Sequence, residues 1–276
     1  MAKIDYSFHT HTFRCGHAVG TDEEYVKAAI KADFHYFGFS DHVMLPGIQH
    51  RIGIRGDYDL YYADYIASTR ALREKYKDHF DIQIGFECEW LGDGYGEYYR
   101  TILENGDVDY LILGQHCFMI GRRLMLYGSL FDYKVARKAY IEDLIAGMES
   151  GLFLYVAHPD YIFRYTNEVS DEDIKAARLI FETAVKLDIP LEINMGPSRW
   201  DHSRKDAQGD WLLAYPQKWF WDLAKEYDVD VCIGPDVHDP NEILSSDYDW
   251  AVEFASSRGL RLLSGKDLYE RIKKRR

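Results

Sequence analysis

Short apolar runs alternate with longer amphipathic segments along most of the chain. The apolar runs are IDYSFH, HYFGFS, IQIGFE, YLILGQ, LFLYVA, LEINM and VCIGP, and their length is typical of buried strands. The segments between them carry apolar residues at i, i+3 and i+4 and predict helices at roughly 22–33, 59–77, 96–105, 132–150, 170–188, 215–227 and 241–258. Asp22, Asp132 and Ser170 are the expected N-caps.

This alternation predicts an α/β fold, because seven strand–helix units in 276 residues favour a closed parallel barrel over an open sheet. No repeat, low-complexity tract or Pro/Gly/Ser-rich linker marks a boundary, so we expect residues 1–276 to form a single domain. The last segment, LRLLSGKDLYERI followed by KKRR, predicts a short apolar run and a final amphipathic helix with a solvated basic end.

Composition and charge exclude several classes of function. The chain has no run of about 18 apolar residues, so no membrane span is expected, and its first residues lack a secretory signal pattern, which favours a cytoplasmic location. A net charge of −13 argues against a binding track for nucleic-acid phosphates. The four cysteines form no CxxC pair and are expected to be free thiols: Cys15, Cys88, Cys117 and Cys232.

The positions of the histidines carry the strongest functional signal. Of eleven histidines, seven lie at or just after the carboxyl ends of predicted strands, where barrel enzymes build their active sites. Two carboxylates, Glu87 and Asp236, lie at such ends as well. In HTH and DVH the two ligand-type residues are two apart, so on a strand they point to the same side. Gly85 and Gly114 precede such residues closely and leave room for close approach. This arrangement predicts a metal site.

Four motifs in order resemble those of the polymerase and histidinol phosphatase (PHP) family. They are the opening HTH with His17 after it, FSDH, the GQHC and AHPD histidines, and the closing DVHD. The resemblance runs from residue 5 to about 240, and the opening segment is especially similar to the histidinol-phosphatase branch. It implies a distorted (β/α)7, TIM-like barrel with three divalent metal ions (zinc, iron or manganese). The implied ligand groups are His9, His11, Glu87 and Asp236; Glu87, His116 and His158; and His17, His42 and His238.

The resemblance also implies an activity, the hydrolysis of L-histidinol phosphate to L-histidinol and phosphate by a hydroxide that bridges two metals held by Glu87 and Asp236. Three divalent ions against two carboxylates and a hydroxide leave about +3 in the pocket, which suits an anionic substrate. Arg164 and Arg199 are the expected phosphate ligands, since a guanidinium matches phosphate oxygens and the branch carries arginines in these loops. Asp160 and His202 are candidate general acids, and Asp41 could orient a histidine.

Alternatives remain at this point. Residues 195–198 depart from the branch, so the substrate could be another small phosphate ester, such as a nucleotide or sugar phosphate. A PHP module without catalysis would be expected to lose ligands, whereas here the set is complete. A metal-dependent amidohydrolase typically has a lysine between its metals, and no lysine ends a predicted strand. A small phosphorylated substrate is the expected partner, and a homodimer stays open.

Overall fold

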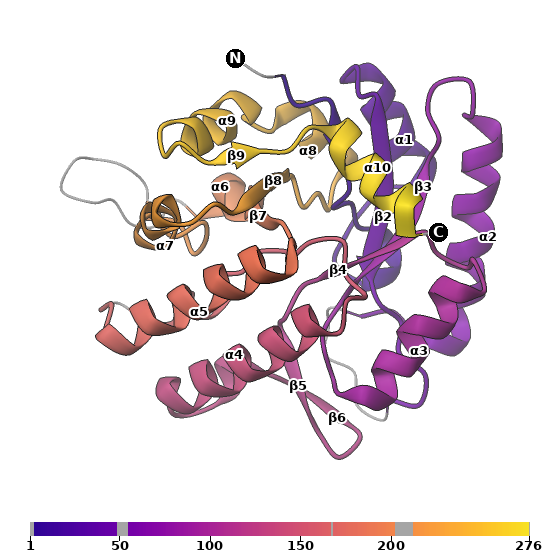
Figure 1. Cartoon of the computed structure of the whole chain (residues 1–276). Coiled ribbons are helices and arrows are strands. Elements are labelled where there is room, and N and C mark those ends of the chain that lie inside the picture. Colours follow the sequence, from indigo (N-terminus) through magenta and orange to yellow (C-terminus); the bar gives the residue numbers. More distant parts are fainter. Residues whose placement is uncertain (1–2, 49–54, 167, 202–211, 276) are drawn as a thin grey trace.

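The computed structural model describes residues 3–48, 55–166, 168–201 and 212–275, and its parallel strands form a curved sheet with helices on the outside (Figure 1). The parallel strands are β1 (Tyr6–Ser7), β2 (Tyr36–His42), β3 (Gln83–Cys88), β4 (Tyr110–Leu113), β7 (Leu191–Asn194), β8 (Asp230–Gly234) and β9 (Arg261–Leu262). Strands β1 to β4 pair in sequence order, as do β7 to β9. The predicted fifth strand contributes only Val156, which bridges Leu113 of β4 and Leu191 of β7.

The two ends of this sheet meet at the carboxyl ends of the strands. Thr10 bridges Val237 in parallel, and the His11 amide donates to the Val237 carbonyl at 3.1 Å. Closure therefore involves the segments that follow β1 and β8 and not the two-residue strand β1 itself. The structure confirms the predicted TIM-like α/β barrel, and the short strands and single bridges are its distortion.

Tyrosines fill the barrel interior and replace part of the missing strand pairing. The hydroxyl of Tyr110 donates to the carbonyls of Phe8 and Phe39 at 3.0 and 2.9 Å, and Tyr6 accepts from the Ile233 amide at 2.9 Å. Gly85 makes room for this packing, because a Cβ there would lie 2.7 Å from the Tyr110 ring. The expectation that Gly85 leaves space at the metal site was therefore wrong, since the space serves the core.

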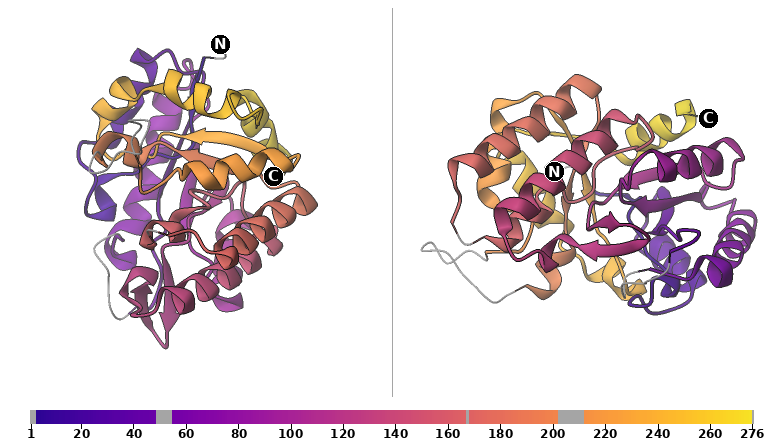
Figure 2. Two further views of the ribbon diagram at one scale, coloured as in Figure 1. Left: turned by 90° about the vertical axis from the view of Figure 1, so that its left-hand side faces the viewer. Right: turned by 90° about the horizontal axis from the view of Figure 1, so that it is seen from below.

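The helices follow one another around the outside of the sheet (Figures 1 and 2). Their bounds are α1 (Asp22–Lys31), α2 (Tyr58–Lys75), α3 (Asp93–Glu104), α4 (Tyr133–Glu149), α5 (Asp171–Leu187), α6 (Gly196–Trp200), α7 (Lys218–Leu223), α8 (Pro240–Ser245), α9 (Tyr248–Ser256) and α10 (Gly265–Arg275). Short 3-10 turns are η1 (Phe13–Cys15), η2 (Tyr127–Ser129), η3 (Tyr161–Tyr165) and η4 (Ala224–Glu226). No helix among the described residues is long and apolar enough to span a membrane.

Two predictions about helix ends were wrong. Thr21, not Asp22, is the N-cap of α1, where it forms a capping box with Glu24, whereas Asp132 and Ser170 cap α4 and α5 as expected. The helix predicted at 241–258 is two helices, because the chain is extended at Ser246 and a second cap, Asp247, starts α9. The Asp22 side chain instead pairs with the buried Arg14 at 2.9 Å.

A β-hairpin directly after His116 was not predicted. It consists of β5 (Cys117–Ile120) and β6 (Arg123–Leu126), which pair antiparallel around a two-residue turn. Gly121 has φ 62°, as the first position of a type II′ turn requires. The hairpin strands have only four residues each, and their apolar stretches CFMI and LML are shorter than the runs from which strands were predicted.

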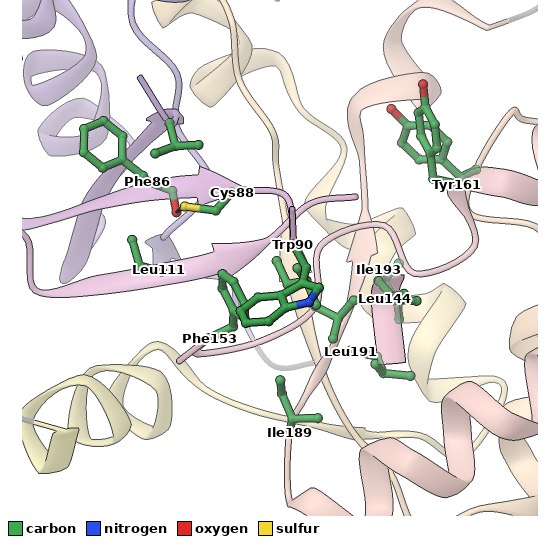
Figure 3. Close-up of a cluster of buried hydrophobic side chains, with 14 of the residues drawn as sticks. Phe86, Cys88, Trp90, Leu111, Leu144, Phe153, Tyr161, Ile189, Leu191 and Ile193 are labelled. Atoms are coloured by element: carbon green, nitrogen blue, oxygen red, sulfur yellow. Dashed lines mark hydrogen bonds between the residues drawn. The ribbon is translucent and has the colours of Figure 1, made fainter. Parts of the chain in front are cut away.

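Most of the apolar core lies between the sheet and the helices. Figure 3 draws part of it, with Phe86 and Leu111 from neighbouring strands and Leu144 from α4, all buried. At the other end of the barrel, Leu268 and Ile272 of α10 belong to a second cluster of buried residues, which also contains the interior residues Tyr6 and Tyr110. The basic end of α10 was expected to be solvated only.

Lys274 and Arg275 are exposed, as expected of the basic end, whereas Lys273 and the preceding Arg271 form ion pairs. Arg271 pairs with Asp188 and Asp230 at 3.0 Å each, and Lys273 pairs with Asp81 at 2.7 Å. These acids lie near the starts of β7, β8 and β3, where the strands begin at the end of the barrel that α10 covers.

Candidate metal centre

All nine predicted metal ligands lie together at the carboxyl end of the barrel. His42 is the last residue of β2 and Glu87 lies on β3, whereas the other seven follow β1, β4, Val156 and β8. Donor atoms within 4.8 Å of one another form the groups His9, His11 and Asp236; Glu87, His116 and His158; His17, His42 and His238; and His11, His42 and Glu87. The first three groups follow the division that the family resemblance implies.

Glu87 lies at the centre of this cluster, in contact with five histidines. Its Oε1 is 2.8 Å from His158 Nε2, 3.5 Å from His9 Nε2 and 3.7 Å from His116 Nε2. Its Oε2 is 3.0 Å from His42 Nδ1 and 3.6 Å from His11 Nε2. A carboxylate with this reach can face more than one cation, as a bridging ligand must.

Asp236 is the second carboxylate of the cluster, and it contacts three histidines. Its Oδ1 is 3.1 Å from His11 Nε2, 3.4 Å from His9 Nε2 and 3.6 Å from His238 Nδ1. Asp236 and His158 both have positive φ, 49° and 31°, a conformation that is rare for residues other than glycine. Such backbone strain is typical of functional sites, where the surrounding structure holds the residue.

Several ring nitrogens of the cluster are buried without a hydrogen bond among the described residues: His9 Nε2, both nitrogens of His11, His42 Nδ1, His158 Nδ1 and His238 Nε2. A buried polar atom without a partner costs about 1–3 kcal/mol. Divalent cations would give these lone pairs partners, and imidazole with carboxylate suits zinc, iron or manganese. The donor set therefore fits the implied metals.

Burial opposes protonation of His9 and His11, but nearby carboxylates raise the pKa of His9 well above its usual value and that of His11 to about 9, so these two rings must release a proton to bind a metal. The other resolved protonation states suit metal binding directly. Burial lowers the pKa of His116 to about 3 and keeps the pKa of His42 and of His238 well below its usual value, so these rings are neutral. Burial opposes ionisation of Glu87 and Asp236, but the surrounding histidines hold the pKa of both carboxyls well below the usual range. Neutral imidazoles and ionised carboxylates are the forms that bind metals.

Three further acids lie behind ligand histidines, and two of them are hydrogen-bonded to the rings. His9 Nδ1 lies 2.7 Å from Glu192 Oε1, His116 Nδ1 lies 3.1 Å from Glu89 Oε1, and His11 Nδ1 lies 3.5 Å from Asp41 Oδ1. Asp41 was a candidate for this role, whereas Glu89 and Glu192 were missed. A glutamate inside the apolar run LEINM was a usable signal, because an acid that is fully buried nearly always has a partner.

Glu89 also forms a buried ion pair with Arg55. Cys117 Sγ also approaches Glu89 Oε1, at 3.6 Å. All four cysteines are buried and free, as expected. Cys15 lies close enough to His11 and His238 to form a further group of metal-type donors, but burial raises the pKa of its thiol, which disfavours the thiolate that metals bind.

The two predicted phosphate ligands lie in different surroundings. Arg164, in η3, is packed among the rings of Tyr161, Tyr165, Trp200 and Tyr215 at 5.2–5.7 Å, and it makes no hydrogen bond or ion pair within the described part of the chain. Arg199, in α6, instead donates hydrogen bonds to backbone carbonyls of the protein. Among the general-acid candidates, His202 lies outside the described residues.

Arg199 contacts the segment that carries Asp236. It donates to the carbonyls of Pro235 and Asp236 at 2.7 and 2.6 Å and pairs with Glu242 at 3.2 Å. Asp160, the other general-acid candidate, is buried and accepts a hydrogen bond from the Gln217 amide at 2.5 Å. The roles of both residues in the reaction remain predictions.

The chain is a parallel α/β barrel that gathers seven histidines and two carboxylates at its strand ends, a donor set that could hold metal ions. The family model of the PHP domain matches residues 7–196, and the chain belongs to this family. Two curated relatives carry the name probable histidinol-phosphatase. The protein of Deinococcus radiodurans is 26% identical over 254 residues (85% of this chain and 86% of the relative). The protein of Schizosaccharomyces pombe is 22% identical over 258 residues (86% of this chain and 81% of the relative).

Solved structures show the same fold. A Listeria monocytogenes protein, provisionally described as a histidinol phosphatase, aligns with a TM-score of 0.70 and 21% identity over 86% of this chain and 97% of its own. The histidinol phosphate phosphatase of Lactococcus lactis, complexed with zinc, L-histidinol and phosphate, aligns with a TM-score of 0.67 and 16% identity over 95% and 97%. At these identities the likeness establishes the fold.

Proposed function

We propose that this protein is a phosphoric monoester hydrolase that converts L-histidinol phosphate and water to L-histidinol and phosphate, as a step of histidine biosynthesis. The observation that carries the proposal is the cluster around Glu87, in which one buried carboxylate contacts five histidines at the carboxyl end of a PHP barrel. The names of the curated relatives support the substrate. A cytoplasmic location belongs to the same proposal.

We propose that the nine ligands hold three divalent transition-metal ions, in the groups that the donor atoms form. When bound, such ions supply a water nucleophile with a lowered pKa and polarise the phosphoryl oxygens. The protein's part is to fix the ligands. Ring nitrogens of His9, His42 and His116 face Glu87 at 3.0–3.7 Å. Burial lowers the pKa of His42 and His116, and the surrounding histidines lower that of Glu87, so these three ligands are in the forms that bind metals.

Arg164 is the residue that we assign to the substrate phosphate. Its guanidinium has no protein hydrogen bond among the described residues, so its N–H groups can donate to an anion. The Tyr161 and Tyr215 rings that pack against Arg164 also lie 5.5 and 5.4 Å from the His158 ring. Arg164 is thus linked to the cluster through two rings, and these rings also offer flat faces to the imidazole ring of the substrate.

Asp160 is the proposed proton donor to the leaving alcohol. Burial raises the pKa of its carboxyl to about 7, so the group carries a proton near neutral pH, as a general acid requires. The Gln217 backbone amide donates to Oδ2 and holds the carboxyl group in place. His202 stays an alternative donor on sequence grounds alone.

Elemental analysis and a phosphate-release assay test the proposal together. The protein is reconstituted with zinc, iron or manganese, and L-histidinol phosphate is assayed beside nucleotide and sugar phosphates. Glu87→Gln serves as the variant, and Glu182→Gln, an exposed position on α5, is the matched control. We expect wild-type protein to bind about three metal equivalents and to prefer L-histidinol phosphate. Glu87→Gln should lose activity, and the control Glu182→Gln should keep it.

Other outcomes would redirect the proposal in defined ways. Three metals with a different preferred ester would keep the reaction and replace the substrate, in line with the unusual residues 195–198. Metal binding without release of phosphate from any ester would point to a non-catalytic module. No bound metal after reconstitution would overturn the proposal.

A further inference from the structure

Glu192 is a buried acid in the middle of β7, directly behind the candidate metal centre. Its side chain has no exposed surface, and both of its oxygens are used. Oε1 lies 2.7 Å from His9 Nδ1. Oε2 accepts from the His158 backbone amide at 3.1 Å and from Asn194 Nδ2 at 2.8 Å. One carboxylate thus reaches two ligand histidines whose side chains belong to different donor groups.

The contact with His9 determines which ring nitrogen is free. A carboxylate can only accept, so Nδ1 must carry a proton to bond with Glu192, and Nε2 is then the nitrogen that can offer a lone pair. Nε2 faces the inside of the cluster, 3.5 Å from Glu87 and 3.4 Å from Asp236. Glu192 thereby orients His9 toward the first donor group.

The contact with His158 acts on the backbone. His158 has φ 31°, and its Nε2 lies 2.8 Å from Glu87 Oε1 in the second donor group. A hydrogen bond from its amide to a fixed carboxylate stabilises this unfavourable backbone conformation. Asn194 extends the link, because its Oδ1 accepts from the Gly196 amide at 2.8 Å, where an added Cβ would approach Asp236 Oδ2 within 2.9 Å.

We infer that Glu192 is a positioning residue that couples the first and second metal groups, a role that rests on the proposed metal-dependent function. The chain makes space for it at one particular position. A Cβ at Gly234, on the neighbouring strand β8, would lie 2.7 Å from Glu192 Cγ and closer still to the carboxylate. Among the described residues, no hydrogen bond or ion pair joins Glu192 to the third group, His17, His42 and His238.

Glu192→Gln tests this role. An amide has the same shape but only one acceptor oxygen, so it cannot accept from His9 and from the His158 amide together. We expect the zinc affinity of two sites to fall by about 10–100-fold, the usual effect of losing a supporting carboxylate, while one site is unchanged. Competition titration with a chromophoric chelator resolves the sites, and Glu182→Gln is the matched control.

A second measurement does not depend on the variant folding. In zinc-loaded wild-type protein, long-range proton–nitrogen NMR should show His9 protonated at Nδ1, with that proton in a hydrogen bond. A wild-type His9 protonated at Nε2 would overturn the inference, as would equal zinc affinities in wild type and variant, or an equal loss at all three sites. Wild-type protein that binds no zinc would instead count against the proposed function, so the two failures are distinguishable.

Discussion

Gly114, the residue after β4, allows the sharpest test of how tightly Glu87 is held. An alanine there would place Cβ 2.6 Å from Glu87 Cγ and closer still to its carboxylate, whereas ordinary contacts of a Cβ begin at 3.4 Å. The carboxylate must therefore withdraw by about 1 Å. An isolated glutamate would do so at little cost, but five histidines surround this one. We expect Gly114→Ala to disturb most of these contacts at once.

The magnitude follows from the displacement. Misplacement of about 1 Å in an active site lowers the rate by roughly 10²-fold, and overpacking a filled core costs about 1–3 kcal/mol. We expect kcat/KM for L-histidinol phosphate to fall by about 10²-fold or more. The metal content should also fall, and Tm should drop by several degrees. Phosphate release, elemental analysis and thermal unfolding measure the three effects.

Gly94→Ala is the matched control, because Gly94 lies in α3 and a Cβ there meets nothing within 4 Å. Alanine is the better helix former by about 1 kcal/mol, so activity should be unchanged and stability equal or slightly higher. The reasoning would be refuted if Gly114→Ala bound a full set of metals and turned over substrate at the wild-type rate. Glu87 would then have room that the structure does not show.

Three further predictions concern residues outside the ligand set. Arg164→Ala should raise KM for phosphate esters about tenfold or more with normal metal content; unchanged kinetics would remove it from the phosphate site. Arg199→Ala should lower metal content, because it frees the backbone of Asp236, whereas normal metal content with a raised KM would make Arg199 a phosphate ligand. Burial raises the pKa of Asp160 to about 7 from about 3.8, so its contribution to stability is full below pH 4 and is lost as pH rises through 7. In denaturant unfolding of the metal-free proteins, the free energy of unfolding of wild type should fall by a few kcal/mol between pH 4 and 7, and that of Asp160→Asn should not. Parallel pH profiles of the two proteins would disprove this prediction.

The ligand positions could be predicted from sequence because they depend on local geometry. Parallel strands present their carboxyl ends at one edge of a barrel, so a histidine or acid at such an end must face the same opening. His42 and Glu87 illustrate this: they lie opposite each other in the register of β2 and β3, and their side chains meet at 3.0 Å. The strand prediction alone was enough to bring them together.

The supporting contacts could not be predicted, because they join residues that are far apart in sequence through tertiary packing. Glu192 is 183 residues from His9, and nothing in either segment specifies the other. The direction of a long side chain cannot be predicted from sequence either. Arg199 lies in the loop that was predicted to bind phosphate, yet its guanidinium turns toward the carbonyls of Pro235 and Asp236. Barrel closure through Thr10 depends in the same way on a distant segment.

The buried acids also change the electrostatic argument for phosphate binding. Three divalent ions with the ligands predicted from sequence leave about +3 in the pocket. The structure adds three carboxylates that each face a ligand histidine, and one buried guanidinium: Glu89, Glu192, Asp41 and Arg55. Counted as charged, they reduce the excess to about +1. Metals alone would then not offset a phosphate dianion, so we expect the cation of Arg164 to contribute to substrate binding. Its replacement should therefore act on KM and leave metal content unchanged.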